Sequence, residues 1–348
     1  MPNKMKVAAI TDPKKVKIKE MNKPSSKQND ILVKVKTCAL CTWEQRVFTG
    51  DKGVPFPLVG GHEVSGTIEE LGKGINKSEY SIGDKVAVRT LYYCGKCYYC
   101  RHGKENLCLE AESFLKGKKE YYGQGGLGQY ISVDVNSIFK LKDDVLHEHG
   151  AFAEPLACVV NSINQGEIQL GDDIIIMGAG TMGLLHVMIA KLRGARVIVS
   201  EPDETRRQLS KKLGADITLN PLEDKLEDII REITAERGGD VIFNTTPIPS
   251  IAKQATEIVG KTGKVIMYSS IHPNKDIKIN PNWIHHSQIK ITGAVSPSIN
   301  SFQKAVDLLN KKLIDPSCLI SDYYPLEETE KAFEQAIKPN TFRVIITD

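Results

Sequence analysis

Residues 173–183 read DIIIMGAGTMG, and this stretch decides the fold of the chain. The run from Asp173 to Met177 is almost wholly apolar, as in a strand buried on both faces of a parallel sheet. Three glycines follow at once. Gly178 permits a tight turn, Gly180 lets the backbone approach a pyrophosphate, and Gly183 lets helix and strand pack closely. The stretch therefore predicts the first βαβ unit of a dinucleotide-binding domain.

The helix after this turn begins at Thr181 and Met182, and its free N–H groups are expected to bind the phosphates. A second apolar strand, residues 196–200, ends at Glu201. An acid about 20 residues past the glycines bonds the adenosine ribose and repels a 2′-phosphate, so Glu201 favours NAD over NADP. Arg206 is the alternative contact, because an arginine near this point accommodates that phosphate.

The chain has 348 residues, more than one hydrophobic core usually contains, so two domains are expected. The pattern of apolar residues also changes along it. Beyond about residue 170, apolar strands alternate with helical patterns, as in a doubly wound parallel sheet. Residues 1 to about 150 instead hold short alternating segments separated by Gly and Pro, typical of a mostly antiparallel β domain. After about residue 285 the alternation of strands and helices ends. The remaining elements are too few to form a domain, so they are expected to return to the first one. We therefore predict a catalytic domain of residues 1–155 and 286–348 and a coenzyme domain of residues 156–285.

Charge and hydropathy exclude several classes of function. The net charge is +3, from 46 basic and 43 acidic residues that are interleaved, so neither a nucleic acid nor an anionic membrane is an expected partner. The first 19 residues lack the apolar core of a signal peptide. No stretch approaches the ~18 apolar residues of a membrane span. A cytoplasmic protein is the expectation.

Four of the eight cysteines fall within a short loop, at Cys94, Cys97, Cys100 and Cys108. Clustered cysteines in a chain without a secretion signal indicate a metal rather than disulfides. Four thiolates suffice for a closed tetrahedral zinc site. An iron–sulfur cluster is the rival metal, and four free buried thiols are the third alternative.

Three further segments carry metal-capable side chains: residues 38–44 (CALCTWE), 60–66 (GGHEVSG) and 153–156 (AEPL). Each has an ordinary structural explanation when taken singly. His62 fits a hydrogen-bonded histidine of the core, and Glu154 fits a turn before a proline. Their meaning depends on whether the fold brings them together.

All these motifs together resemble the zinc-containing medium-chain dehydrogenase family, which includes sorbitol, threonine and alcohol dehydrogenases. The family's Gly-His-Glu motif stands at residues 61–63, its cysteine spacing at 94–108 and its coenzyme glycines at 178–183, in the family's order over nearly the whole chain. The resemblance implies a GroES-like, mostly-β catalytic domain plus a Rossmann coenzyme domain with a doubly wound parallel sheet. It also implies that the four-cysteine loop holds a structural zinc.

Carried over position by position, the resemblance implies a second, catalytic zinc. Cys41 matches its thiolate ligand and His62 its imidazole ligand, while Glu63 is a carboxylate that binds the zinc or lies just behind it. Glu154 matches the third protein ligand, which is a cysteine in many alcohol dehydrogenases and a glutamate in the sorbitol-dehydrogenase-like branch. The resemblance thus implies NAD-dependent oxidation of a secondary alcohol on a small polyol, by a homo-oligomer (a dimer or tetramer).

The chain departs from the family's proton path. Trp43 stands where the family has a Ser or Thr, so Thr42 is the nearest hydroxyl, and Arg46 stands where alcohol dehydrogenases often have a relay histidine. Arg46 is expected either to bind a phosphate or carboxylate of the substrate, or to be a structural ion pair or an exposed loop charge. The arginine that polyol dehydrogenases carry past the last Rossmann strand is missing from residues 293–298. The alternatives are therefore a sugar-phosphate or threonine-type dehydrogenase, or a non-catalytic binding protein on the same fold.

Overall fold

The computed structural model describes residues 4–117 and 119–348, which belong to two compact units. The first unit comprises the chain up to Ala157 and then Pro297–Asp348, and the second comprises Cys158–Ser296. The predicted division placed residues 286–296 with the first unit, whereas here they lie with the second. The reason is a short strand, β13 (Lys290–Gly293), that extends the sheet of the second unit. Its four residues are too few, and too exposed, to show a hydrophobic run.

The first unit is built on a mostly antiparallel seven-stranded sheet, in which β6 also pairs with β3. Along the sheet the order is β14 (Ile320–Pro325), β15 (Arg343–Thr347), β3 (Asp30–Ala39), β4 (Glu63–Leu71), β5 (Lys85–Arg89) and β7 (Ile138–Lys140), with β6 spanning Tyr130–Asp134. A separate hairpin joins β1 (Lys4–Asp12) to β2 (Lys15–Asn22). The helices are α1 (Thr42–Thr49), α2 (Tyr98–Arg101), α3 (His147–Ala151), α4 (Ala153–Gly166), which continues into the second unit, α10 (Ile299–Asn310) and α11 (Thr329–Ala336).

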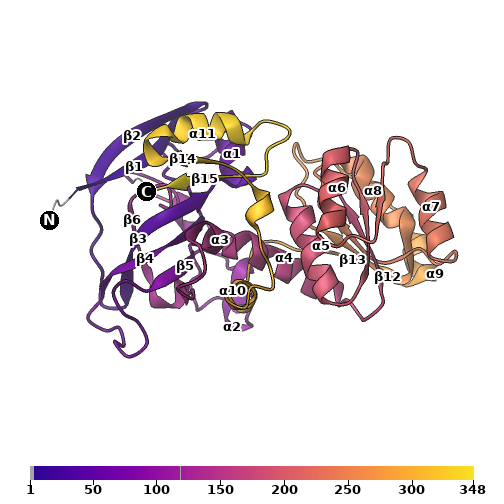
Figure 1. The fold of residues 1–348 in the computed structure, drawn as a ribbon, viewed down its shortest axis with the longest axis horizontal. Coiled ribbons are helices and arrows are strands. Elements are labelled where there is room, and N and C mark those ends of the chain that lie inside the picture. Colours follow the sequence, from indigo (N-terminus) through magenta and orange to yellow (C-terminus); the bar gives the residue numbers. More distant parts are fainter. Residues whose placement is uncertain (1–3, 118) are drawn as a thin grey trace. The chain divides into compact units, whose positions relative to one another are not determined.

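The C-terminal elements return to the first unit, as the sequence predicts. β15 pairs antiparallel with β3, so that Ile346 lies opposite Cys38. Figure 1 shows this return as yellow elements among the indigo strands. The helix α11 packs on α1 through stacked rings of Phe333 and Phe48, whose centroids are 4.9 Å apart. Both phenyl rings are buried, so this contact joins the two ends of the chain in one core.

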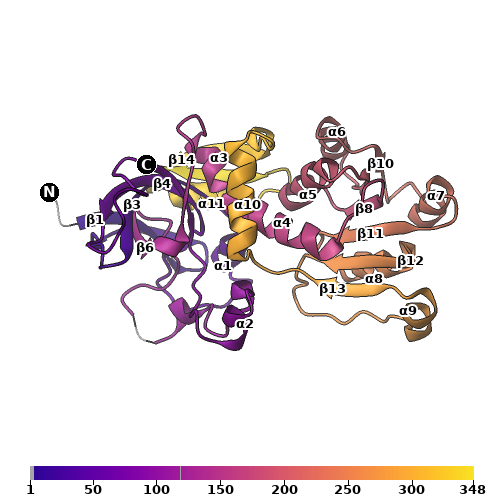
Figure 2. The ribbon, with the colours of Figure 1, turned by 90° about the horizontal axis from the view of Figure 1, so that it is seen from below.

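The second unit is a six-stranded parallel sheet, and the predicted doubly wound architecture is confirmed. Its order is β10 (Ile217–Leu219), β9 (Arg196–Ser200), β8 (Asp173–Met177), β11 (Gly239–Asn244), β12 (Val259–Met267) and β13. The strand order advances in opposite directions from β8, and right-handed crossovers then place the connecting helices on opposite faces. Accordingly α5 (Thr181–Leu192) and α6 (Glu204–Lys212) cover one face, and α7 (Leu226–Ile233), α8 (Pro249–Ile258) and α9 (Pro281–Ser287) cover the other (Figure 2).

One buried histidine makes this unit sensitive to acid. His186 of α5 is fully buried; its Nδ1 lies 2.7 Å from the carbonyl oxygen of Met182 and its Nε2 2.8 Å from the hydroxyl of Ser162. A neutral ring fits this environment, with Nδ1–H donating and Nε2 accepting. Burial lowers the pKa of His186 to about 4. The folded chain therefore binds fewer protons than the unfolded chain between pH 4 and pH 6.5.

We expect stability to be full above about pH 6.5 and to fall by about 3 kcal/mol as the pH approaches 4, since each pKa unit corresponds to about 1.4 kcal/mol. Urea unfolding across this pH range measures the slope. His186→Gln should flatten it, while the exposed His285→Gln should leave it as in the parent. An identical slope in His186→Gln would contradict the assignment.

Among the described residues, no helix combines the length and the apolar character needed to cross a membrane.

Candidate metal and nucleotide sites

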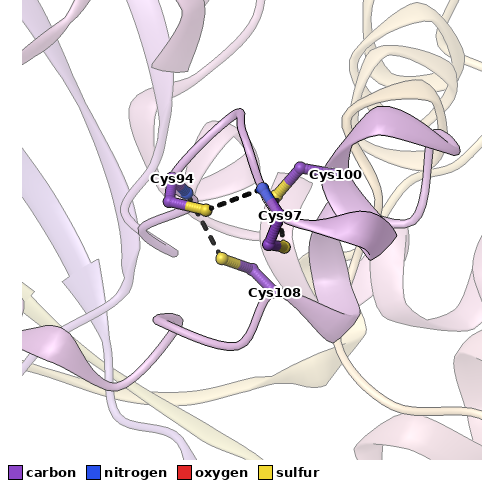
Figure 3. Close-up of side chains that lie close together, drawn as sticks. All are labelled: Cys94, Cys97, Cys100 and Cys108. Atoms are coloured by element: carbon purple, nitrogen blue, oxygen red, sulfur yellow. Dashed lines mark hydrogen bonds between the residues drawn. The ribbon is translucent and has the colours of Figure 1, made fainter.

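The four-cysteine loop closes on itself. The sulfurs of Cys94, Cys97, Cys100 and Cys108 lie within 4.8 Å of one another, turned toward a common point (Figure 3). Cys97 caps the N-terminus of α2 and Cys100 lies within that helix, while Cys108 follows a short 3-10 turn. The spacing of two residues lets the backbone wrap around a single point, so the loop needs no distant partner to form.

Backbone N–H groups stabilise thiolates in this loop. The N–H of Cys94 donates to the Cys108 sulfur at 3.2 Å, and the N–H of Cys97 donates to the Cys94 sulfur at 3.4 Å. A backbone N–H of Cys100 is the main reason that the pKa of Cys97 is lowered to about 6. The thiolate is the form of cysteine that binds metal. Four thiolates around one point fit a closed, tetrahedral zinc site.

A second donor cluster is assembled from distant segments. One donor atom each from Cys41, His62 and Glu63 lies within 4.8 Å of the others. Cys41 precedes α1, and its backbone forms the N-cap of that helix. Glu63 opens β4, and His62 precedes it. A thiol, an imidazole and a carboxylate are the donor types that zinc accepts, so these residues fit the metal chemically.

Glu44 orients the imidazole of this cluster. It is fully buried on α1; its Oε1 accepts a hydrogen bond from the Gly61 N–H at 2.9 Å and lies 2.6 Å from His62 Nδ1. The other ring nitrogen, Nε2, is thereby left for a metal. Burial lowers the pKa of His62, but Glu44 and Cys41 outweigh it and raise the pKa well above its ordinary value. A carboxylate behind a metal-binding histidine fixes its ring and raises its basicity in this way.

Arg343 holds the carboxylate of Glu63. Its Nε donates to one carboxylate oxygen of Glu63 and its Nη2 to the other, both at 2.8 Å, and Nη2 lies 3.9 Å from the Cys41 sulfur. Both partners are buried. This arrangement engages both oxygens of Glu63 in a bidentate pair with the first residue of β15.

The other predicted residues of this region are more scattered. Glu154 stands in the first turn of α4, outside the 4.8 Å set, and its charge acts on Arg343 and Arg89. Thr42 begins α1 and is exposed. Arg46 is half-buried on α1, where its Nη2 lies 3.5 Å from the carbonyl oxygen of Asp51, and no carboxylate of the described residues pairs with it.

Trp43 forms an aromatic wall beside the cluster, as its position suggests. Its ring meets the ring of His62 edge-on, with the centroids 6.4 Å apart and the planes at 90°. On another side it meets Phe114, also at 6.4 Å. The ammonium of Lys52 lies 5.5 Å from the Trp43 centroid. The indole ring therefore packs against the imidazole of the cluster.

The glycine turn has the geometry of a phosphate-binding loop. Gly178 adopts φ +103°, a left-handed conformation that residues with a Cβ rarely take. A Cβ on Gly183 would lie 2.0 Å from the carbonyl oxygen of Gly178, so only glycine permits this contact between helix and strand. The space around Gly180 is open, because a Cβ there would meet nothing within 4 Å. Gly180 caps the N-terminus of α5, where Thr181 and Met182 begin the helix.

Glu201 is folded onto this loop. It is buried at the end of β9, and its carboxylate accepts hydrogen bonds from the N–H of Ala179 at 2.7 Å and of Asp203 at 3.0 Å. Arg206 is half-buried in α6, and its N–H donates to the side chain of Asp203. The carboxylate of Glu201 is thus held at the glycine turn, where an adenosine ribose binds in folds of this kind.

The sequence predicts no role for Glu44 or Arg343. A signal existed for each. Glu44 is an acid one helical turn from Cys41, and Arg343 is a charged residue at the head of the apolar run Val344 to Ile346. Neither signal identifies the partner, because Arg343 lies 280 residues from Glu63 in the chain.

Comparison with known proteins assigns the family. Residues 27–143 match the alcohol dehydrogenase GroES-like domain, and residues 181–311 match the zinc-binding dehydrogenase domain. The sequence is 31% identical to a D-arabitol-phosphate dehydrogenase of Enterococcus avium, over 94% of this chain and 92% of that protein. It is 29% identical to a sorbitol dehydrogenase of Bacillus subtilis, over 97% and 95%.

Solved structures give the same answer for the fold. An alcohol dehydrogenase from Escherichia coli CFT073, solved with NADH, superposes with a TM-score of 0.88 at 25% identity, over 99% of this chain and 100% of that one. A zinc-binding dehydrogenase from Sinorhizobium meliloti 1021, solved with NADP, gives 0.90 at 25% identity, over 99% of both chains. The chain belongs to the zinc-containing medium-chain dehydrogenase family, in its sorbitol-dehydrogenase-like branch, and it is an oxidoreductase acting on alcohols.

Proposed function

We propose that the chain oxidises a secondary alcohol of a small polyol and transfers the hydride to NAD. The observation that carries this proposal is the convergence of Cys41, His62 and Glu63 within 4.8 Å, in a chain that also forms the glycine turn at residues 178–183. A zinc ion held by Cys41 and His62, with Glu154 as the expected third ligand, would act as a Lewis acid that lowers the pKa of the alcohol. The nicotinamide of NAD would accept the hydride.

The remaining work falls to the protein's own groups. Glu44 keeps His62 in one orientation through its 2.6 Å contact with Nδ1. Arg343 donates to both oxygens of Glu63, so that carboxylate is already engaged. Trp43 brings no hydroxyl to the position that relays the proton in the family. The proton of the alcohol is therefore expected to leave through water near the exposed Thr42 rather than through Glu63.

Coenzyme choice is the second part of the proposal. The buried carboxylate of Glu201 at the glycine turn supports NAD, because a 2′-phosphate would meet a negative charge there. The half-buried Arg206 is the group nearby that would favour NADP. Relatives of this fold have been solved with either coenzyme, so the choice depends on these two residues.

The testing experiment measures reduction of NAD+ and of NADP+ by the zinc-loaded protein. Its panel contains polyols, polyol phosphates, simple secondary alcohols and threonine. The proposal expects NADH formation on the polyol class, abolished by a chelator. Silence across the panel, with two zinc ions and NAD still bound, would instead support a non-catalytic binding protein on this fold.

A sugar-phosphate dehydrogenase is the second candidate. The 31% identity to the arabitol-phosphate enzyme favours it, as does Arg46, three residues after Trp43 on α1, which contacts the carbonyl oxygen of Asp51 and pairs with no carboxylate of the described residues. It predicts turnover of phosphorylated but not of free polyols, lost in Arg46→Ala. Equal turnover of both substrates would exclude it, and threonine in the same panel tests the amino-acid alternative.

The assembly and location of the protein complete the proposal. We infer a homo-oligomer, a dimer or tetramer, acting in the cytoplasm. β13 supports this, because it ends the second unit's sheet with a strand edge that another copy can extend. Light scattering should give two or four times the 38.5 kDa chain mass. A monomer at micromolar concentration would contradict the oligomer.

A further inference from the structure

A buried arginine without a carboxylate partner lies next to the proposed zinc cluster. Arg89 ends β5 and is 1% exposed, and in the sheet it lies directly opposite Glu63. Burying a guanidinium is costly unless its charge is compensated. Within residues 4–117 and 119–348, no carboxylate oxygen lies within 4 Å of its nitrogens, since Glu63 is engaged by Arg343 instead.

The contacts that Arg89 does make are neutral. Its Nη1 donates to the carbonyl oxygen of Leu91 at 2.8 Å, and its Nη2 donates to that of Pro297 at 3.4 Å. Its guanidinium carbon lies 5.2 Å from the ring centroid of Tyr93. The Nε–H is buried and has no partner. A guanidinium has five N–H donors, so these two hydrogen bonds leave three of the five unused.

Arg89 lines a groove of about 600 Å³, here called the Arg89 groove, which belongs wholly to the first unit. Gln124 also lines it, and the Oε1 of this side chain is buried without a partner. Two polar side chains of one groove therefore present unsatisfied atoms, which is the condition that a bound polar group would relieve.

The groove adjoins the Cys41–His62–Glu63 cluster. Thr90 lines the groove, and its hydroxyl donates to the carbonyl oxygen of His62 at 3.4 Å. Phe114 lines it as well and touches Trp43, whose ring meets that of His62. A molecule reacting at the cluster could thus extend into the groove.

The charge of the groove favours an anion. Its other charged side chains are Lys27 and Asp134. The carboxylate of Asp134 is engaged locally, because it accepts hydrogen bonds from the backbone and side-chain amides of Asn136. Cys94 also lines the groove, and its sulfur is turned toward the other three cysteines. Glu105, Glu154 and Cys100 act on the buried guanidinium of Arg89 through their charge. Among the described residues none of them forms a hydrogen bond or ion pair with it, so its unused N–H groups stay available to a bound anion.

We propose that the Arg89 groove binds a carboxylate or phosphate group of a small-molecule ligand, with the guanidinium of Arg89 as its principal contact. A planar guanidinium matches either anion with two parallel hydrogen bonds, and its burial strengthens them. That the anion belongs to the substrate rests on the proposed dehydrogenase function, and it narrows the substrate to a polyol phosphate or a hydroxy acid. Binding of the anion itself does not depend on that function.

Calorimetric titration of the full, zinc-loaded chain with inorganic phosphate, and separately with malonate, tests the site. Arg89→Met should weaken binding of at least one anion about 10- to 100-fold, as for lost hydrogen bonds to a charged group. As a control, Lys19→Met removes one positive charge from an exposed position of β2, and it should change the anion affinity less than twofold. Phosphate bound at the glycine turn would survive in Arg89→Met, which separates the two positions. Equal affinity in parent and Arg89→Met, or no anion binding by the parent, would overturn the proposal.

A second variant guards against misfolding of Arg89→Met. Gln124→Glu leaves the arginine in place and brings a competing carboxylate into the groove, so anion binding should weaken at least tenfold. Unchanged binding in this variant would also overturn the proposal. Thermal unfolding of each variant verifies that it is folded.

The activity panel separates this inference from the proposed function. If the protein oxidises neutral polyols but binds no anion, the proposal of an anion site in the Arg89 groove is wrong, while the proposed dehydrogenase function stands. If the parent binds an anion, Arg89→Met does not, and no alcohol is oxidised, the anion site is supported and the proposed dehydrogenase function is wrong. If both stand, comparing kcat/KM for a polyol phosphate and for a hydroxy acid identifies which anion the groove selects.

Discussion

Replacing His62 with alanine is expected to lower kcat/KM for alcohol oxidation about 1,000-fold. A Lewis acid contributes several kcal/mol to such a reaction, and each 1.4 kcal/mol is tenfold in rate. The imidazole is one of the three donors brought within 4.8 Å, and Glu44 leaves its Nε2 free for the metal. Steady-state NADH formation and zinc content by mass spectrometry measure the two effects together.

The design includes two matched variants. Glu44→Gln keeps a hydrogen-bond acceptor beside His62 Nδ1 but removes its charge, so zinc affinity should fall only about 10- to 100-fold. Cys97→Ser alters the other cluster and should lower the zinc content from two ions per chain to one. A His62→Ala protein with full zinc content and full activity would refute the assignment of the catalytic cluster.

Replacing Arg343 with methionine is expected to lower the free energy of unfolding by about 3–5 kcal/mol. The change leaves the fully buried carboxylate of Glu63 without its partner, and breaking a buried ion pair on one side costs about this much. Although burial opposes its charge, Glu63 and Cys41 hold the pKa of Arg343 above its ordinary value, so the guanidinium is charged in the parent. Urea unfolding measures the difference.

A double variant tests whether the loss of stability in Arg343→Met comes from the unpaired charge of Glu63. In Glu63→Gln/Arg343→Met both charges are gone, and part of the stability should return. Lys312→Met breaks the exposed pair of Lys312 with Asp144, and it should change stability by less than about 1 kcal/mol. If Arg343→Met were no more destabilising than Lys312→Met, the buried pair would not be a structural element of the cluster.

Some parts of this protein depend on local sequence alone. The glycine turn is one, because the left-handed φ of Gly178 and the contact of Gly183 with the Gly178 carbonyl involve neighbours within the same loop. The cysteine loop is another, since its four sulfurs and the N–H groups that donate to them fall between residues 94 and 110. Patterns of this kind are readable because the interacting groups are close along the chain.

The candidate catalytic cluster is different in kind. Cys41 and His62 belong to separate segments, and the resemblance to a family, not their spacing, suggested that they meet. The domain boundary near residue 286 likewise depended on β13, whose pairing with β12 gives no periodic signal in four residues. Glu154 remains a predicted ligand, because the fold sets it near Arg343 and Arg89 without bringing it into the 4.8 Å set.

The sequence by itself determined the doubly wound coenzyme unit, the return of the C-terminus and the identity of the metal-capable side chains, because these follow from periodicity and from chemistry within short segments. Only the tertiary structure decided which charged side chains contact the candidate metal ligands or lie next to them. Pairing of β15 with β3 brings Arg343 to Glu63 and Cys41 across 280 and 302 residues, and pairing of β4 with β5 sets Arg89 opposite Glu63. Such partners are chosen by strand register, which no local pattern encodes.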